Sequence, residues 1–318
     1  MNGIRTTAGW LLNRPWIWVF AAALLVWLVV VLEVSGRGAG GVLTVSLQFA
    51  TFYVILGLGQ MMVIATGPGN IDLSMPSVLT LAAYLSMGVM GGSDANLWLG
   101  VGTGVGVGLA AGVGNVTLIH LLRIPPMIAT LAAGFIVDSL AMAYSTGSTA
   151  QPAPALMAFS TGRVLGVPFI AWLFIAVAAL VAVTMQLTPF GRHVLAIGQN
   201  ERAAYLAGVR IRRIRSAVFI LSALAASICG ILLAGASGGA SLNMGEGYLL
   251  MSIAVVVLGG TSIFGGQVAI PGVWGAALLL YLIVSLLNVL SVTSGVRYLT
   301  IGLVIIAVLA VGHSGRNT

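Results

Sequence analysis

Apolar residues run along most of the chain in stretches of about 20, the length that an α-helix needs to cross a membrane. The first stretch is longer than the roughly 7–15 apolar residues of a signal-peptide core, so we expect it to remain as a spanning helix. The pattern therefore predicts an all-α polytopic membrane protein that forms a single transmembrane domain over residues 1–318. Ten spans are expected, at 16–34, 43–65, 74–91, 97–120, 127–146, 168–187, 216–236, 248–264, 270–291 and 297–313.

Composition excludes a soluble protein, because 59% of the residues are hydrophobic and only 6% are charged. All thirteen basic residues are arginine. With a cytoplasmic N-terminus and ten alternating spans, only Arg37, Arg163 and Arg297 fall outside, as the positive-inside rule requires. The arginines thus predict that both termini are cytoplasmic, and they indicate topology instead of nucleic-acid binding. Cys229 lies within an apolar span, and with no second cysteine it is expected only to pack.

Two segments interrupt the apolar pattern inside the predicted membrane region. ATGPGNIDLSMPSV occupies 65–78 and LGGTSIFGGQVAIPGV occupies 258–273. Such backbone must be buried in protein or line water, so we expect broken or re-entrant helices at both places. We place them in comparable positions of two four-span units, spans 2–5 and spans 7–10. The two units are offset by five spans, and an odd offset reverses their direction across the membrane, which predicts an inverted repeat. Ordinary Gly/Pro turns are the alternative.

Polar residues at membrane depth are costly and often functional. Asp72 is the foremost candidate, either as a cap of the third span or as part of a solute path. Weaker candidates are Gln48, Asn115, His120, Asp138, Asn243 and Glu246, the last expected in an external loop. The sequence has no residue set with metal-ligand spacing and no recognisable catalytic set. The predicted substrate pathway consists of Gln60, Asn70, Asp72, Ser74 and Asn288.

Glycines recur every four residues in the fourth predicted span, at Gly100, Gly104, Gly108 and Gly112. A row of this kind makes a flat helix face that allows a neighbouring helix to approach closely. We therefore interpret the row as a packing surface.

The segment 189–215 holds six of the thirteen arginines and is expected to lie in the cytoplasm. Residues 199–208 can form a short helix of about two and a half turns, with Asn200 as its cap and Gly208 as its stop. Its apolar side would suit a groove on a partner protein. The four arginines that follow, Arg210, Arg212, Arg213 and Arg215, are interpreted as topology signals.

Three motifs resemble one family. They are GNIDLS at 69–74 followed by SV at 77–78, the segment from Phe190 to Gly208, and VVLGGTSIFGG at 256–266. In this order they resemble the permease subunits of bacterial ABC importers for ribose and related monosaccharides, a group that includes autoinducer-2 permeases. Departures occur at Pro68, Asn70, 75–76 and 249–250, near the breaks, and they bear on the identity of the solute more than on the fold.

The resemblance implies a bacterial inner-membrane permease that passes a small polar solute inward. Its implied partners are ABC ATPase subunits, an extracytoplasmic solute-binding protein, and a second copy or a related permease within the lipid membrane. The chain itself would need no cofactor, because ATP would bind the partner, and without lysine it cannot form a standard P-loop. The residues that would couple to the ATPase are Gln199, Asn200, Glu201, Ala203, Ala204, Leu206 and Gly208.

A different class of transporter is the main alternative from the residues alone. A proton-coupled secondary transporter would also use broken helices and an inverted repeat, and it would rely on Asp72 and Asp138 as titratable groups. A membrane-embedded enzyme lacks a catalytic set. Pentose, hexose, polyol and autoinducer-like solutes are not distinguished.

Overall fold

The computed structural model describes residues 15–33, 39–145 and 151–293, and a few positions between 295 and 306. Within this part, seven helices are long and apolar enough to cross a membrane. They are α2 (Pro15–Glu33), α3 (Ala39–Ala65), α5 (Leu97–His120), α6 (Pro126–Ser145), α8 (Phe169–Leu187), α11 (Ile211–Ser237) and α13 (Ile270–Val289). The described residues also form two shorter apolar helices, α4 (Met75–Met90) and α12 (Tyr248–Leu258). The chain is thus a helical, multi-pass membrane protein.

The first nine predicted spans each correspond to one of these helices, and 97–120 has the same bounds as α5. The eighth prediction, 248–264, is wrong at its end, because α12 stops at Leu258. The chain turns away there at Gly260, which has a φ of +93°. Hydropathy misses this end because two apolar residues, Ile263 and Phe264, follow the short interruption at 259–262. The tenth predicted span, 297–313, lies mostly outside the described residues.

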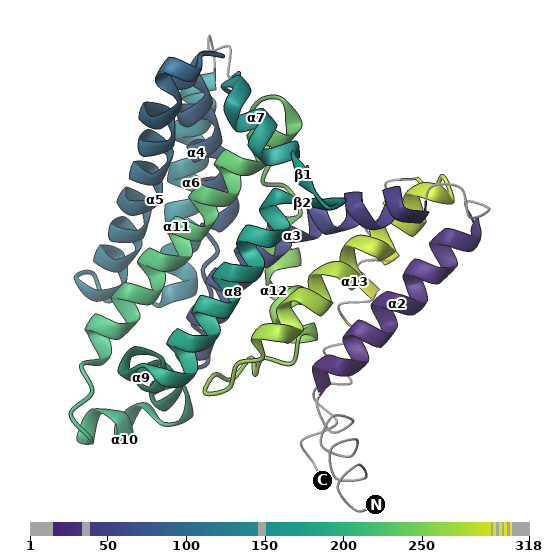
Figure 1. Cartoon of the computed structure of the whole chain (residues 1–318). Coiled ribbons are helices and arrows are strands. Elements are labelled where there is room, and N and C mark those ends of the chain that lie inside the picture. The colour runs from purple at the N-terminus through teal and green to yellow at the C-terminus, as the bar shows by residue number, and fades with distance from the viewer. Residues whose placement is uncertain are drawn as a thin grey trace, which may run out of the picture.

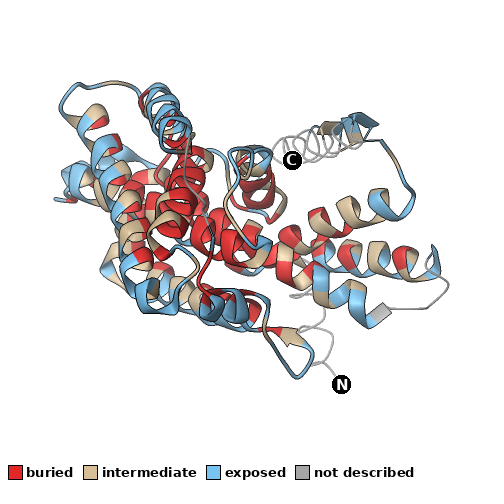
Figure 2. Ribbon diagram, turned by 90° about the horizontal axis from the view of Figure 1, so that it is seen from above, coloured by how far each residue is buried: buried red, intermediate tan, exposed pale blue. Residues whose placement is uncertain are grey.

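Two long helices lie at the centre of the molecule. α3 packs against α8, α11, α12 and α13, while α11 packs against α3, α4 and α5. In Figure 1, α4, α5, α6 and α11 form one bundle, and α2 lies beside α13 on the opposite side. Figure 2 shows that the buried residues follow the middle of this arrangement. The segments between the central helices are therefore held inside protein.

The glycine row on α5 packs as predicted. Gly100, Gly104, Gly108 and Gly112 are buried, and a Cβ atom at any of them would collide with α4 or α11. At Gly108, for example, the obstacle is the Ser227 side chain of α11. The three helices therefore approach one another more closely than larger side chains would permit.

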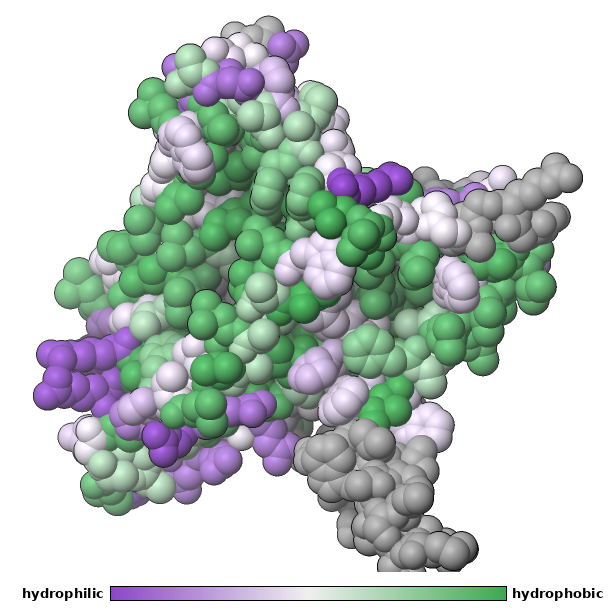
Figure 3. Space-filling model, in the orientation of Figure 1, coloured by the Kyte–Doolittle hydropathy of each residue, from purple (hydrophilic) through white to green (hydrophobic). Residues whose placement is uncertain are grey.

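The surface divides into apolar and polar regions (Figure 3). Exposed Trp98, Leu99, Phe135 and Leu180 belong to the sides of α5, α6 and α8. Hydrophilic residues gather at the end where α9 (Pro189–Gln199) and α10 (Glu201–Leu206) lie beside the start of α11. This division matches a protein whose sides contact lipid or another apolar chain.

The stretch 147–167, between the fifth and sixth predicted spans, contains structure that its sequence did not suggest. It holds α7 (Pro154–Thr161) and the antiparallel pair β1 (Arg163–Val164) and β2 (Val167–Pro168). The short helix η1 (Asp94–Asn96) is joined to it, because the backbone N–H of Ala155 donates to Asp94 Oδ1 at 2.8 Å. Residues 146–150 lie outside the described part.

Candidate functional site

The first predicted break is present between α3 and α4. Residues 66–74 form neither helix nor strand, and most of them are buried. The Asn70 side chain satisfies part of this backbone by donating from Nδ2 to the Gly67 carbonyl at 3.1 Å. Apart from the exposed Pro68 and Gly69, the segment thus has the protein surroundings that irregular backbone would need at membrane depth.

Asp72 is fully buried in this segment and accepts three hydrogen bonds. Its Oδ1 accepts from the backbone N–H of Ser74 at 3.0 Å and from the Ser74 hydroxyl at 2.6 Å. Its Oδ2 accepts from the Ser222 hydroxyl of α11 at 2.7 Å. Asn115 of α5 extends the network by donating to Ser74 Oγ at 2.8 Å. Because Ser74 is the N-cap residue of α4, the carboxylate joins the start of α4 to α5 and α11.

The predicted pathway residues do not gather into one place. Gln60 is fully buried in α3, with neither amide atom hydrogen-bonded within the described structure. Asn288 is exposed in the last turn of α13. Gln48, a weaker candidate, donates from Nε2 to the Ser160 carbonyl of α7 at 3.4 Å. Only Asp72, Ser74 and Asn115 among the sequence candidates share a hydrogen-bonded network in the described residues.

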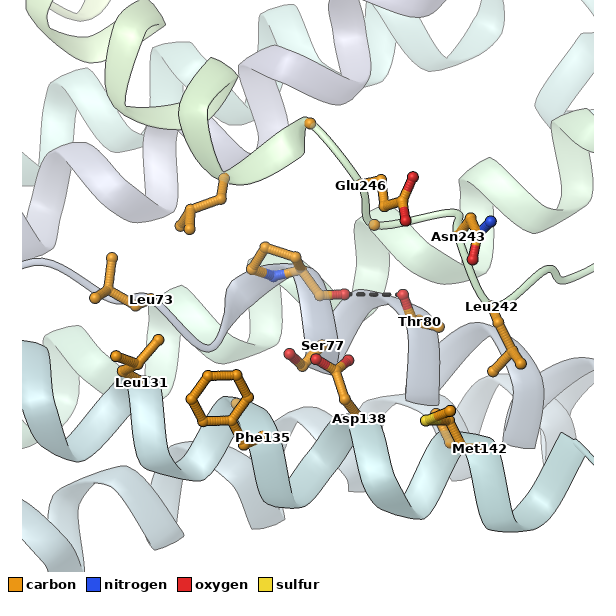
Figure 4. Close-up of a pocket in the computed structure, with 16 residues that line it drawn as sticks. Leu73, Ser77, Thr80, Leu131, Phe135, Asp138, Met142, Leu242, Asn243 and Glu246 are labelled. Carbon is orange, nitrogen blue, oxygen red and sulfur yellow. Dashed lines mark hydrogen bonds between the residues drawn. The ribbon is translucent and has the colours of Figure 1, made fainter.

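A cavity of about 460 Å³ lies beside this network. It is bounded by the start of α4, by α6 and by the connection 238–247 between α11 and α12 (Figure 4). Its volume falls within the roughly 300–1,000 Å³ of small-molecule sites. The polar residues that line it are Ser77, Thr80, Asp138, Asn243 and Glu246. Leu131, Phe135 and Met142 are among its apolar residues.

Three of the weaker sequence candidates meet in this cavity. Asp138 points from α6 toward α4, and Asn243 and Glu246 come from the connection 238–247 (Figure 4). All three side chains are exposed, so they can exchange with solvent or contact a solute. None of Gln60, Asn70, Asp72, Ser74 and Asn288 lines the cavity. A polar lining with apolar patches can bind a small polyhydroxylated molecule through hydrogen bonds and ring contacts.

The cavity forms where two helices begin inside the molecule. Gly245 lies so close to the Pro76 carbonyl and Thr80 of α4 that a Cβ atom there would collide with both. Gly247 has a φ of +80° and is the N-cap of α12, so the chain turns directly into the second helix. Residues from both helix starts line the cavity. Helix N-termini carry unpaired N–H groups and a partial positive charge, which are suited to polar ligands.

The position of the second break was predicted wrongly relative to the first. If α3 and α4 correspond to α11 and α12, the counterpart of 66–74 is 238–247, because each connects the first two helices of its unit. The predicted break at 258–273 is real in that residues 259–269 are not helical, but it follows α12. The stretch 238–247 was not predicted as the counterpart of 66–74, because its glycines and polar residues are also typical of an ordinary surface loop.

The short helix that follows α9 was predicted with its correct cap. The Asn200 side chain accepts from the Ala203 N–H at 2.9 Å, α10 covers Glu201–Leu206, and Gly208 follows with a φ of +83°. The helix is shorter than predicted, because Gln199 ends α9 instead of starting α10. Leu206 is 77% exposed and is available to a partner.

Two of the predicted coupling residues contact this chain itself. Ala204 is only 5% exposed and packs against Ile197 and Val209, so most of its surface is covered by its own chain. Glu201 pairs with Arg215 of α11 at 2.8 Å. Arg215 therefore fastens α10 to α11 in addition to any role in topology.

Comparisons with known proteins agree with the helical architecture. Residues 42–309 match the family described as "Branched-chain amino acid transport system / permease component". The L-arabinose transport system permease protein AraH of Escherichia coli (strain K12) is 34% identical over 271 residues, 82% of each chain. The ribose import permease protein RbsC of Bacillus subtilis (strain 168) is 35% identical over 263 residues, 80% of each chain.

A third relative carries a different kind of solute by name. The autoinducer 2 import system permease protein LsrC of Escherichia coli O9:H4 (strain HS) is 33% identical over 268 residues, 84% of this chain and 78% of that one. No solved structure matches the chain. With a family match over residues 42–309, the chain belongs to the permease component family of branched-chain amino acid transport systems.

Proposed function

We propose that this chain is the membrane permease of an ATP-driven importer that carries a monosaccharide or a related small polar solute into the cytoplasm. The observation that carries the proposal is similarity over four fifths of the chain to permeases named for L-arabinose, ribose and autoinducer 2. The chain is a transport subunit and not an enzyme, and ATP hydrolysis belongs to a separate subunit.

The cavity beside α4 and α6 is the proposed station for the solute. Its support is the convergence of two helix starts with Asp138, Asn243 and Glu246. Broken helices that meet near mid-membrane are the usual way in which transporters bring backbone polar groups to a substrate. A second permease copy, or a related one, would close the open side along the exposed apolar residues of α6.

The proposed topology has ten spans, including 297–313, re-entrant backbone at the breaks, an inverted repeat and both termini in the cytoplasm. In the repeat, α3, α4 and α5 correspond to α11, α12 and α13. Reciprocal packing supports it, because α11 contacts α4 and α5 while α3 contacts α12 and α13. In this topology α10 faces the ATPase, and α7 with the β1–β2 pair faces the solute-binding protein outside. Leu206 and Tyr205 are the exposed apolar residues of α10 that fit a docking groove.

A proton-coupled transporter is the alternative reading of the broken helices. Such a transporter needs a carboxyl group that exchanges protons with both sides of the membrane. Asp72 is enclosed and already accepts hydrogen bonds from Ser74 and Ser222, which fits a structural role better. The named relatives supply no support for this class.

The proposal is tested by purifying the permease with the products of its neighbouring genes and reconstituting the complex in proteoliposomes. We expect an ATPase to co-purify and radiolabelled ribose or arabinose to accumulate only with ATP and a binding protein. Uptake that an uncoupler abolishes while ATP persists would overturn the proposal, as would the absence of any co-purifying ATPase.

A further inference from the structure

Three segments that are far apart in sequence meet at the end of the molecule near α9. They are the end of α3, the connection 259–269 between α12 and α13, and the end of α9. The Gly266 N–H donates to the Ala65 carbonyl at 3.0 Å. The Gln199 side chain donates from Nε2 to the Gly266 carbonyl at 3.3 Å. The peptide groups of Gly266 are therefore bound on one side by α3 and on the other by α9.

Glycines bring these backbones into direct contact. A Cβ atom on Gly198 would collide with the Ala65 carbonyl and with the backbone of Gly266. A Cβ atom on Gly265 would collide with the backbone of Gly67, the second residue after α3. Gly265 and Gly67 have φ values of +84° and +120°, which other residues rarely adopt. Close backbone contact leaves little slack, so displacement of one segment is passed to the others.

The junction is joined to α10 by a single residue step. Gln199 ends α9, and the next residue, Asn200, caps α10. The ion pair between Glu201 and Arg215 holds the start of α10 against α11. α10 is therefore linked both to α11 and, through Gln199, to Gly266.

The other two segments of the junction, the end of α3 and the connection 259–269, belong to or lead into non-helical backbone. Ala65 is followed directly by residues 66–74, which continue into α4. Gly266 lies in the connection that continues into α13. The junction therefore links the segment that leads into α4 with the segment that leads into α13.

We infer that Gln199 is a positioning residue that ties the α9–α10 segment to Gly266, so that both non-helical segments move together with α10. This inference rests on the proposed function, since the motion is supplied by an ATPase on α10. It reassigns Gln199, which the sequence placed among the ATPase contacts, because its amide is directed to Gly266 of its own chain.

The inference is tested with Gln199→Ala and Gln199→Glu in the reconstituted complex. Alanine removes the donor, and glutamate places an acceptor against the Gly266 carbonyl. We expect solute uptake per ATP hydrolysed to fall by about fivefold or more, the scale set by loss of one hydrogen bond. Retention of the ATPase on gel filtration should not change. Gln267→Ala is the matched control, because it removes an exposed amide from the same connection as Gly266.

Hydrogen exchange supplies a second measurement that does not need transport. The Gly266 amide should exchange faster in Gln199→Ala than in the parent, because its bond to Ala65 loses support from the other side. Unchanged coupling ratio and unchanged exchange would overturn the inference. Loss of ATPase binding in the Gln199 variants alone would also overturn it, by making Gln199 a docking residue. A parent complex that binds no ATPase would instead sink the proposed function.

Discussion

The Ser222 hydroxyl of α11 donates a 2.7 Å hydrogen bond to the Asp72 carboxylate, across 150 residues of sequence. Asp72 lies in the non-helical segment before α4, so this bond fastens that segment to one of the two central helices. Ser74 supplies two further donors, and Asn115 reaches Ser74 from α5. The carboxylate thus fixes where α4 begins, and with it one wall of the cavity.

Two substitutions of Asp72 distinguish its hydrogen-bonding role from the role of its charge. Asp72→Ala leaves the buried hydroxyls of Ser74 and Ser222 without their acceptor, at a cost of about 1–3 kcal/mol for each unsatisfied group. Asp72→Asn should cost much less, because a serine hydroxyl can turn and accept from the amide. Thermal unfolding of the purified protein in detergent measures both. Equal melting temperatures for Asp72→Ala and the parent would contradict the structural role, and a stable Asp72→Asn without uptake would show that the charge takes part in transport.

Neighbouring glycines of α5 should respond in opposite ways to the same substitution. Gly108→Ala places a methyl group against Ser227 and should destabilise the packing of α5 on α11. Gly106 has open space around its Cβ position. Gly106→Ala should therefore be neutral or stabilising by up to about 1 kcal/mol, the difference in helix propensity. Melting temperatures test the pair, and equal loss in both variants would contradict the packing of the glycine row.

The helices were predictable because each depends mainly on local sequence. An apolar run sets the position of α5, and Asn200 and Gly208 set the ends of the α10 segment. The cavity was not predictable in this way, because its lining comes from α4, α6 and 238–247, which meet only after folding. Burial of Ala204 likewise depends on Val209 returning to pack against it.

Neutralising the carboxyl groups of the cavity should change transport without changing stability. Asp138 and Glu246 are exposed, so Asp138→Asn and Glu246→Gln leave no buried group unpaired. We expect the KM for solute uptake to rise about tenfold or more for each, since hydrogen bonds to a charged acceptor are worth roughly 1.5–3 kcal/mol. Glu33→Gln, at the exposed end of α2, is the control of the same chemistry outside the cavity. Parent-like uptake in both cavity variants would argue against this place as the solute station.

A charge on the exposed side of α10 should separate the ATPase from the permease. Leu206→Asp adds a carboxylate to a side chain that is 77% exposed, so the permease should fold normally while its affinity for the ATPase falls. Leu165→Asp, at a side chain that is 92% exposed in the β1–β2 turn, is the matched control and should keep the ATPase bound. Ala204→Asp should behave differently from both, because an unpaired charge against Ile197 and Val209 is strongly destabilising. Co-purification and melting temperature together distinguish the three variants. Normal ATPase retention by Leu206→Asp would remove α10 as the docking helix.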